Sequence, residues 1–242
     1  MKVIVCGANG AMGKLLTARL EGQIAGLVSL DGDNGVAKTF DELGIVDADV
    51  IIDFSSPVGL RERLEFAKTK GIGIVLASTG FTADDLALIK EYEQSVAIFR
   101  TANLSLGINL MQALVKAAAQ VLGEGFDVEI IEKHHNLKKD APSGTALMLA
   151  DSVNEAFDGG KQFVYGREGI VGAREKKEVG IHAVRGGTIV GEHEVIFAGE
   201  DEVITISHSA ASKRVFAVGA IRAAKWLVGK PAGKYEMKDM LA

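Results

Sequence analysis

The chain has 242 residues, 48% of them hydrophobic and 24% charged, which is ordinary for a globular enzyme of one large domain or two modest ones. A formal net charge of −5 argues against nonspecific nucleic-acid binding, because that binding needs a positive surface. Cys6 is the only cysteine, so an intramolecular disulfide is excluded and a reducing compartment is favoured. With no run of roughly 18 apolar residues and no cleavable leader pattern, we expect a cytoplasmic protein without a membrane partner.

Short apolar runs alternate with helical patterns over the first hundred or so residues. We predict strands at 2–7, 26–30, 48–55, 73–79 and 96–101, and helices at 11–21, 58–70 and 82–94. The run 49–54 is apolar without alternation, which indicates burial on both faces and hence a parallel sheet covered by helices. The helix at 58–70 carries an apolar stripe of Leu60, Leu64 and Ala67. Its charged residues are expected outside that stripe: Arg61, Glu62, Arg63 and Glu65.

The spacing of apolar residues changes after a longer helical pattern at 105–122. Strand patterns at 127–133, 178–185, 188–198 and 202–209 alternate more between apolar and polar residues, with turns predicted at 186–187 and 199–201. One helix is predicted at 143–157, and a last helix at 212–229 ends at a glycine that precedes Pro231 by two positions. The fold class is therefore α/β, with a separate central α+β domain whose sheet is predicted to be mostly antiparallel.

A glycine-rich turn follows the first predicted strand: Gly7, Ala8, Asn9, Gly10, Ala11, Met12 and Gly13. Gly7 permits a sharp turn, Gly10 lets backbone amides approach a pyrophosphate, and Gly13 lets the next helix pack close to the strand. The turn has a strand before it and a helix after it, which is the context that dinucleotide binding requires. A tight corner between strand and helix, without any ligand, is the alternative.

Asp31 stands where the second strand ends, close to the spacing of roughly 20 residues after the glycines that is typical of a ribose-binding carboxylate. Such a carboxylate repels a 2′-phosphate, so we expect NADH to be accepted at least as well as NADPH. The alternative is that Asp31 is only a turn residue in the glycine-rich run 31–35.

A basic loop precedes the helix predicted at 143–157. Ser143 is a candidate N-cap of that helix, and Pro142 keeps the preceding chain extended. The amides of Gly144 and Thr145 then point toward the space before the helix, where the helix dipole favours an anion. Positive charge is supplied to the same neighbourhood by four side chains: His134, His135, Lys138 and Lys139. A carboxylate-bearing substrate fits both features.

Three interpretations of His134 and His135 compete. Adjacent residues on a strand point to opposite sides, and no cysteine or further histidine at ligand spacing is nearby, so we expect no metal site. A solvated basic loop stays open as the plain alternative. In the catalytic interpretation, His134 donates a proton and Lys138 donates to an oxyanion or a developing carbanion. The other histidines lie in strand patterns and are expected to be hydrogen-bonded structural residues: His182, His193 and His208.

Taken together, these motifs make the chain resemble the 4-hydroxy-tetrahydrodipicolinate reductases, also called dihydrodipicolinate reductases, of lysine and diaminopimelate biosynthesis. The similarity runs nearly from end to end. It is carried by GANGAMG at 7–13, DVIIDFS at 49–55, ASTGF at 77–81, ANLSLGIN at 102–109, EKHHNLKKDAPSGTA at 132–146, YGREG at 165–169, HAVRGGTIVGEHEVIFAG at 182–199 and AVGAIRAAKWL at 217–227. The histidine, lysine and DAPSGT combination is far more specific than the glycine turn.

The resemblance implies a nicotinamide-binding Rossmann domain of residues 1–104 and 213–242, and a substrate-binding and oligomerisation domain of residues 105–212 that forms a homotetramer. It implies that His134 is the general acid and Lys138 its partner. The carboxylates of a small cyclic dicarboxylate substrate would be held by His135, Lys138, Gly144 and Thr145. The nicotinamide would be lined by the Ser-Thr-Gly loop and a second loop: Ser78, Thr79, Gly80, Ala102 and Asn103.

Two departures from the family pattern concern the cofactor. Many relatives carry an arginine where this chain has Ala11, and a basic residue where it has Gly32. Because both changes weaken recognition of a 2′-phosphate, we predict a higher kcat/KM with NADH than with NADPH, although both NADH and NADPH are candidate cofactors.

Two other functions are compatible with parts of the sequence. A different dehydrogenase on the same scaffold, such as a semialdehyde dehydrogenase that forms a thioester, would need an accessible catalytic cysteine, which Cys6 in the first strand does not provide. A non-catalytic dinucleotide sensor would not require His134 or Lys138, and would usually carry an output module.

Overall fold

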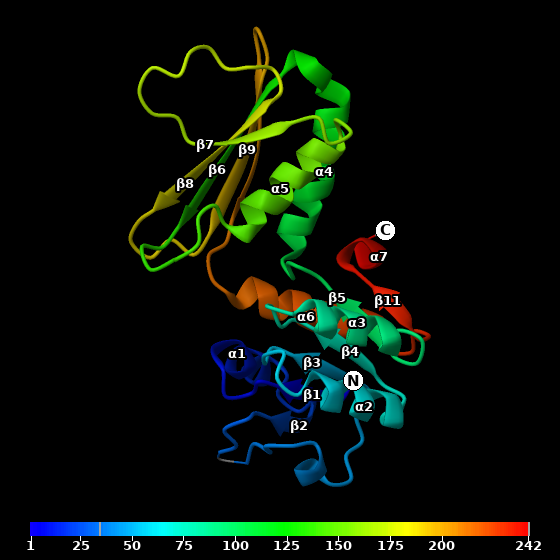
Figure 1. Cartoon of the computed structure of the whole chain (residues 1–242). Helices are drawn as coiled ribbons and strands as arrows, with labels where there is room; N and C mark the ends of the chain where they lie inside the picture. Colours follow the sequence, from blue (N-terminus) through cyan, green and yellow to red (C-terminus); the bar gives the residue numbers. More distant parts are fainter. Residues whose placement is uncertain (34, 242) are drawn as a thin grey trace. The chain divides into compact units, whose positions relative to one another are not determined.

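The computed structural model describes residues 1–33 and 35–241 and divides into two compact units (Figure 1). The first unit consists of Met1–Ser105 together with the segment that starts at Arg214, and the second consists of Leu106–Lys213. The first unit is thus assembled from two distant parts of the chain, whereas the second is continuous.

The first unit is built on a six-stranded parallel sheet in the order β11-β5-β4-β3-β1-β2. Its strands are β1 (Val3–Cys6), β2 (Ile24–Val28), β3 (Val50–Asp53), β4 (Gly73–Leu76), β5 (Ala97–Arg100) and β11 (Gly233–Tyr235). Its helices are α1 (Ala11–Arg19), η1 (Asp41–Leu43), α2 (Leu60–Lys70), α3 (Ala83–Tyr92), α6 (Arg214–Leu227) and α7 (Met237–Leu241). The predicted Rossmann-type sheet is confirmed, and its strand order reverses between β1 and β3, where ligands bind in doubly wound sheets.

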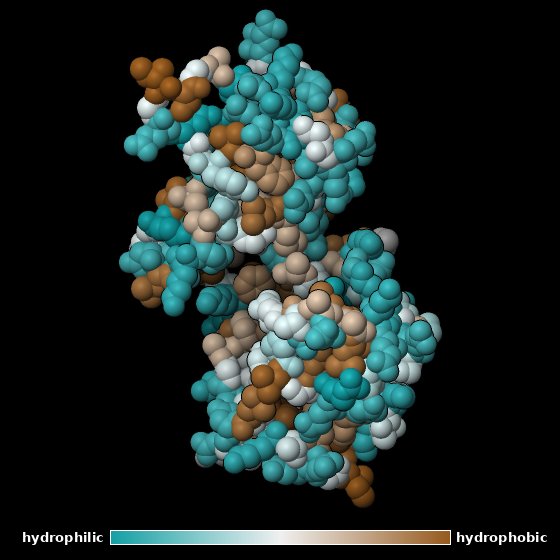
Figure 2. All heavy atoms as spheres, in the orientation of Figure 1, coloured by the Kyte–Doolittle hydropathy of each residue, from teal (hydrophilic) through white to brown (hydrophobic). Residues whose placement is uncertain are grey.

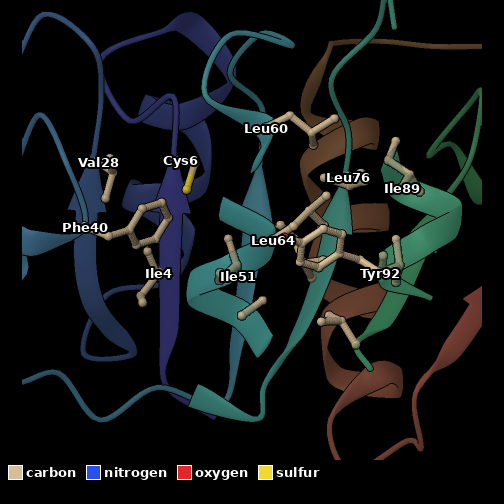
Figure 3. Packing of buried hydrophobic residues seen from close by; sticks show 14 residues of the cluster. Ile4, Cys6, Val28, Phe40, Ile51, Leu60, Leu64, Leu76, Ile89 and Tyr92 are labelled. Carbon is tan, nitrogen blue, oxygen red and sulfur yellow. The ribbon is translucent and has the colours of Figure 1, made fainter. Parts of the chain in front are cut away.

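The runs in which apolar residues do not alternate with polar ones form strands that are buried along their whole length, as in β1, β3 and β4. Figure 3 shows Leu60 and Leu64 of α2 packed in one cluster with Ile51 of β3. Cys6 lies in the same cluster, and burial, followed by the charge of Asp53, raises the pKa of its thiol well above the usual range. A thiol that stays protonated is not a nucleophile.

The expectation for Arg63 was wrong. Its side chain does not lie outside the apolar stripe of α2 but is buried, at 6% exposure, and its Nε lies 3.0 Å from Oδ2 of the fully buried Asp53. We expected Arg63 to face the solvent because an arginine is rarely buried unless it is paired with an acidic residue. Its partner, Asp53, lies ten positions earlier on another element, where the pattern of the helix does not reveal it.

The second unit has a five-stranded sheet in the order β10-β9-β6-β8-β7, with both helices packed against it. Its strands are β6 (Asp127–His134), β7 (Gln162–Tyr165), β8 (Glu178–Arg185), β9 (Glu192–Ala198) and β10 (Val203–Ser209). Its helices are α4 (Leu106–Leu122), η2 (Gly123–Gly125) and α5 (Gly144–Glu155). Buried residues alternate along β6 and β9, and their inward side chains, such as Val128 and Phe197, form a core with Val115 and Leu149 of the helices.

The prediction of a mostly antiparallel sheet was wrong, because the sheet is mixed. β6 pairs antiparallel with β9, and β9 with β10, but β6 and β7 both run parallel to β8. The turn at 199–201 joins two paired strands as predicted, whereas β8 and β9 are separated in the sheet by β6. The strand β7 escaped prediction because it is a four-residue edge strand without a fully buried residue.

The helix α4 is the most apolar element of the second unit. By length and composition alone, the segment Leu106–Gly125 could cross a membrane, with a window of mean hydropathy 1.2. In the structure one face of α4 is buried in the core through Ile108, Met111 and Val115. Its opposite face exposes Leu110 and Leu114, so only part of its apolar character is explained by packing within the chain.

Candidate active site

The glycine turn fills the corner between β1 and α1, and two of its glycines are required by close backbone approaches. Gly7 has a φ of +74°, and a Cβ there would lie 2.7 Å from the carbonyl oxygen of Phe54. A Cβ on Gly13 would lie 2.1 Å from the carbonyl oxygen of Gly7. Side chains are therefore excluded at Gly7 and Gly13, at the two ends of the turn that also contains Ala8, Asn9 and Gly10. Ala11, Met12 and Gly13 form the first turn of α1.

Asp31 accepts two hydrogen bonds, one of which comes from this turn. Its Oδ1 accepts from Asn9 Nδ2 at 3.0 Å and from Ser29 Oγ at 2.6 Å. The bond from Ser29, followed by that from Asn9, lowers the pKa of the Asp31 carboxyl from its usual value, so it is an anion at neutral pH. Asp31 also closes a local turn, since Gly32 N donates to Ser29 O at 3.0 Å. The two interpretations of Asp31 are thus compatible with each other.

Lys38, which was not predicted to be a site residue, lies beside Gly32. A Cβ on Gly32 would fall 2.4 Å from Cγ of Lys38, so the aliphatic part of this exposed lysine occupies the place where a side chain at position 32 would begin. Its charge therefore belongs to the same corner of the first unit as the Asp31 carboxylate.

The remaining predicted cofactor residues follow β4 and β5, at the same carboxyl edge of the sheet. Ser78 is buried and donates to Asp53 Oδ2 at 3.1 Å, whereas Thr79 and Gly80 are exposed. Ala102 is exposed, and Asn103 is buried with its Oδ1 accepting from Ser105 N at 2.8 Å. The Ser-Thr-Gly loop is therefore anchored at Ser78 and open beyond it.

Asp53 at the end of β3, which was not predicted to be a site residue, connects the segment after β3 with the loop after β4. Its Oδ1 accepts from Ser55 N at 2.9 Å and also from Ser55 Oγ, and its Oδ2 faces Ser78 and Arg63. Arg63 in turn donates to the carbonyl oxygens of Ser56 and Val58. The only sequence signal was an aspartate that ends an otherwise apolar strand.

In the second unit, Glu132 is the centre of the predicted catalytic loop. It is fully buried, and each of its two oxygens accepts two hydrogen bonds. Oε2 is bonded by Arg185 Nη1 at 2.8 Å and His134 Nδ1 at 2.6 Å, and Oε1 by Arg185 Nη2 at 2.7 Å and Ser143 N at 2.9 Å. Burial alone would raise the pKa of Glu132, but the bonds from Arg185, His134 and Ser143 outweigh it and lower the pKa. The carboxylate thus joins His134 to the start of α5.

The predicted anion-binding corner has the expected form. Ser143 is the N-cap of α5, with an extended backbone, and its Oγ accepts from Ala146 N at 3.2 Å. Gly144 and Thr145 form the first turn of that helix, after a cis peptide bond between Ala141 and Pro142.

Lys138 and His135 lie in the loop that leads to this corner. Lys138 Nζ pairs with Asp140 Oδ1 at 2.8 Å, and the amide of Lys138 donates to the carbonyl oxygen of His135. Arg185, which bonds Glu132, also donates to Asp140 O at 2.7 Å, so this loop is connected to the Glu132 cluster. Lys138 therefore already holds one carboxylate, of a residue that is itself mostly exposed.

His193, expected from the sequence to be a hydrogen-bonded structural residue, lies beside His134 and Ser143 at this site. It is 5% exposed, its Nε2 lies 3.1 Å from Ser143 Oγ, and its ring meets that of His134 edge to face at 5.2 Å between centroids. The hydrogen bonds expected for structural histidines are present at His193 and at His182, which pairs with Glu129 at 2.7 Å. His208 has no hydrogen-bond partner for Nδ1 among the residues described.

Within residues 1–33 and 35–241, no group of three or more histidine, cysteine, aspartate or glutamate side chains has a geometry that could hold a metal ion. His134 is instead bonded to a carboxylate that is saturated by other donors.

The environment of His193 predicts a pH dependence of stability. Burial, and then the nearby charge of His134, lower the pKa of His193 from 6.5 to about 4. The unfolded chain therefore takes up this proton at a higher pH than the folded chain, so stability is complete above pH 6.5 and declines as the pH falls toward about 4. The loss from this residue is at most about 3 kcal/mol.

We expect His193→Gln to remove this component. Urea unfolding at about pH 7 and about pH 4.5 should show the free energy of unfolding of the wild type falling more steeply than that of the variant. Equal slopes for the two proteins would mean that His193 does not resist protonation.

Comparison with known proteins places the chain in a family. Residues 1–104 match the model described as Dihydrodipicolinate reductase, N-terminus, and residues 107–241 match Dihydrodipicolinate reductase, C-terminus. The chain is 47% identical to the 4-hydroxy-tetrahydrodipicolinate reductase of Caldanaerobacter subterraneus subsp. tengcongensis, with 100% of this chain and 98% of the relative covered. It is 43% identical to the enzyme of the same name from Clostridium novyi, with 99% and 98% covered.

The fold has solved counterparts. A dipicolinate-bound dihydrodipicolinate reductase from Paenisporosarcina sp. TG-14 superposes with a TM-score of 0.78 at 22% identity, covering 98% of this chain and 97% of that one. A probable dehydrogenase from Thermotoga maritima gives a TM-score of 0.62 at 12% identity, with 99% and 92% covered. The resemblance found in the motifs is confirmed over the full length, and the chain belongs to the dihydrodipicolinate reductase family.

Proposed function

We propose that this chain reduces 4-hydroxy-tetrahydrodipicolinate, by way of dihydrodipicolinate, to tetrahydrodipicolinate, in lysine and diaminopimelate biosynthesis. Family membership supports the reaction, since the relatives at 47% and 43% identity carry that enzyme name. The observation that carries the assignment of the site is the Glu132 cluster, because it fixes a histidine beside a helix N-terminus that favours a carboxylate. The redox partner is a nicotinamide dinucleotide, as a Rossmann-type reductase requires.

The reaction adds a hydride and a proton to the substrate. When bound, the nicotinamide supplies hydride to the ring carbon remote from nitrogen, and electron density moves toward the nitrogen. We assign His134 as the general acid that completes the step, with Lys138 as its partner. The substrate carboxylates are held by His135, Lys138 and the start of α5 at Gly144 and Thr145. Lys138 would exchange Asp140 for a substrate carboxylate, which has the same chemistry.

The cofactor is assigned to the carboxyl edge of the parallel sheet. The pyrophosphate would lie against the turn formed by Gly7 to Gly13, and the adenosine ribose would meet Asp31, which Asn9 orients. The nicotinamide side would be lined by residues of the two open loops after β4 and β5: Ser78, Thr79, Gly80, Ala102 and Asn103.

We expect His134→Ala and Lys138→Ala each to lower kcat by about 10²-fold or more, because positioned acid catalysis is worth about 10² to 10⁴. The assay follows the loss of reduced-nicotinamide absorbance with freshly made product of dihydrodipicolinate synthase. Lys177→Ala removes an exposed lysine of the same unit and serves as the matched control. Wild-type turnover in the two site variants would reject the catalytic assignment, and no oxidation of either cofactor by the wild type would reject the proposed function.

A preference for NADH over NADPH is the finer part of the proposal. Asp31 is an anion beside the glycine turn, and Ala11 and Gly32 provide no positive charge, so a 2′-phosphate meets net repulsion. Lys38 partly offsets that repulsion, because it lies where a basic side chain at position 32 would begin. NADPH should therefore be a poorer but usable cofactor.

Two opposite substitutions test this balance. Lys38→Ala should lower kcat/KM with NADPH by roughly fivefold and leave NADH nearly unchanged, as expected for the loss of one exposed charge contact. Asp31→Asn should lower kcat/KM with NADH and raise it with NADPH. The contradicting result would be a wild-type enzyme that prefers NADPH in parallel assays with both cofactors.

A homotetramer formed through the second unit is also proposed, on the family resemblance and on exposed apolar side chains. The edge strand β10 exposes Val203 and Ile204, and the loop between β7 and β8 exposes Ile170 and Val171. Figure 2 shows the brown spheres of that loop at its upper left. Unpaired strand edges and exposed apolar side chains are features of surfaces that associate with other chains.

A cytoplasmic location stays a prediction.

Light scattering at working concentration should give four times the mass of the chain. Val203→Lys on β10 should shift the assembly to smaller species, whereas Val58→Lys, an equally exposed valine in the first unit, should not. A monomer mass for the wild type would contradict the tetramer.

A further inference from the structure

We infer that Glu132 is a positioning residue, which fixes the His134 imidazole with its proton on Nδ1 and holds it in register with the first turn of α5. The inference rests on the proposed function in one respect, namely that His134 is the general acid. The geometric part, which nitrogen carries the proton and what holds the ring, can be tested without turnover.

The bonding at Glu132 determines the direction of each hydrogen bond. A carboxylate with four donors around it accepts only, so the 2.6 Å contact with His134 has Nδ1 as the donor. In the neutral ring this leaves Nε2 as the other nitrogen, the one available to exchange a proton with substrate. A histidine that is to pass a proton through one nitrogen needs the other one fixed, as in the orienting of a base by a third group.

The surroundings of Nε2 support this orientation. A Cβ on Gly191 would lie 3.1 Å from His134 Nε2, so the absence of a side chain at position 191 leaves room in front of that nitrogen. Nε2 makes no hydrogen bond to any residue in the described ranges 1–33 and 35–241, whereas Nδ1 is bonded to Glu132. The ring is therefore bonded through Nδ1, while Nε2 faces the space beside Gly191 and 12% of the side chain stays exposed.

The same carboxylate also fixes the anion-binding corner. Oε1 accepts from Ser143 N, the backbone amide of the N-cap residue, at 2.9 Å. Arg185 bonds both oxygens, at 2.7 and 2.8 Å, and so prevents rotation of the carboxylate that would release either contact. One side chain thereby sets the separation between the proton donor and the carboxylate-binding helix start.

A matched control exists on the same strand. Glu129, three positions earlier on β6, accepts two bonds from Arg167, one from Arg174 and one from His182, so it forms a similar group of arginine, carboxylate and histidine. It is bonded neither to His134 nor to the start of α5. Glu129→Gln thus removes a comparable network from β6 while leaving the Glu132 contacts in place.

The variant Glu132→Gln keeps the size of the side chain and removes its ability to accept on both sides. With the amide oxygen kept by Arg185, the NH2 group faces His134 and requires an acceptor there, so the neutral ring must move its proton to Nε2. We expect ¹⁵N spectra of the imidazoles, recorded at alkaline pH without ligand, to show Nδ1–H for His134 in the wild type and in Glu129→Gln. Glu132→Gln should show mainly Nε2–H.

Turnover and ligand affinity complete the test. Loss of an outer partner of a functional histidine typically costs about 10- to 100-fold, so kcat of Glu132→Gln should fall by that factor. Calorimetry with dipicolinate as the probe should show weaker binding, because Arg185 then bonds one oxygen instead of two and the start of α5 is held less firmly. Glu129→Gln should stay within about threefold of the wild type in both measurements.

Several outcomes would overturn the inference. An Nε2–H tautomer in the wild type does so by itself, even if Glu132→Gln fails to fold. A folded Glu132→Gln with the wild-type tautomer, kcat and dipicolinate affinity does so as well, and so does an equal loss in Glu129→Gln. Failure of the proposed acid is distinguishable, because it would appear as full turnover of His134→Ala with the tautomer result unchanged.

Discussion

Both units depend on a buried carboxylate paired with an arginine. Asp53 and Glu132 are both fully buried, and Arg63 and Arg185 are their partners. Removing a carboxylate from water costs several kcal/mol unless it is paired and its other lone pairs are bonded. The remaining bonds come from serines of the neighbouring loops and, at Glu132, also from His134, so those loops must stay in place for the charge to be tolerated. Burial of each pair therefore requires the neighbouring loops to keep one geometry.

The position of these pairs explains why the candidate site is rigid where it needs to be. Asp53 ends β3 and Glu132 lies two positions before the end of β6, and each connects its strand to a segment assigned to ligand binding, at Ser78 in one unit and at Ser143 in the other. Residues assigned to touch a ligand, such as Thr79 and Gly80, lie just beyond the anchored positions. Sites on strand ends and helix starts hold their geometry better than sites on long loops.

Much of this fold was predictable from local patterns, and the contacts between distant residues were not. The strands, helices, glycine turn and N-cap at Ser143 follow from periodicity and local backbone chemistry, which act within a few residues. The inward course of Arg63, the parallel placement of β7 and the pairing of Glu132 with Arg185 depend on residues many positions apart. Periodicity reports which face is buried, but it does not identify the partner that makes a buried charge acceptable.

The discontinuous make-up of the first unit has a consequence for the order of folding. β11 pairs with β5 across more than a hundred intervening residues, and α6 also belongs to this unit. During synthesis, the continuous second unit is complete while β5 is still an open sheet edge. The first unit therefore finishes last, although it begins first. Until the final segment emerges, protection of that edge falls to whatever associates with the nascent chain.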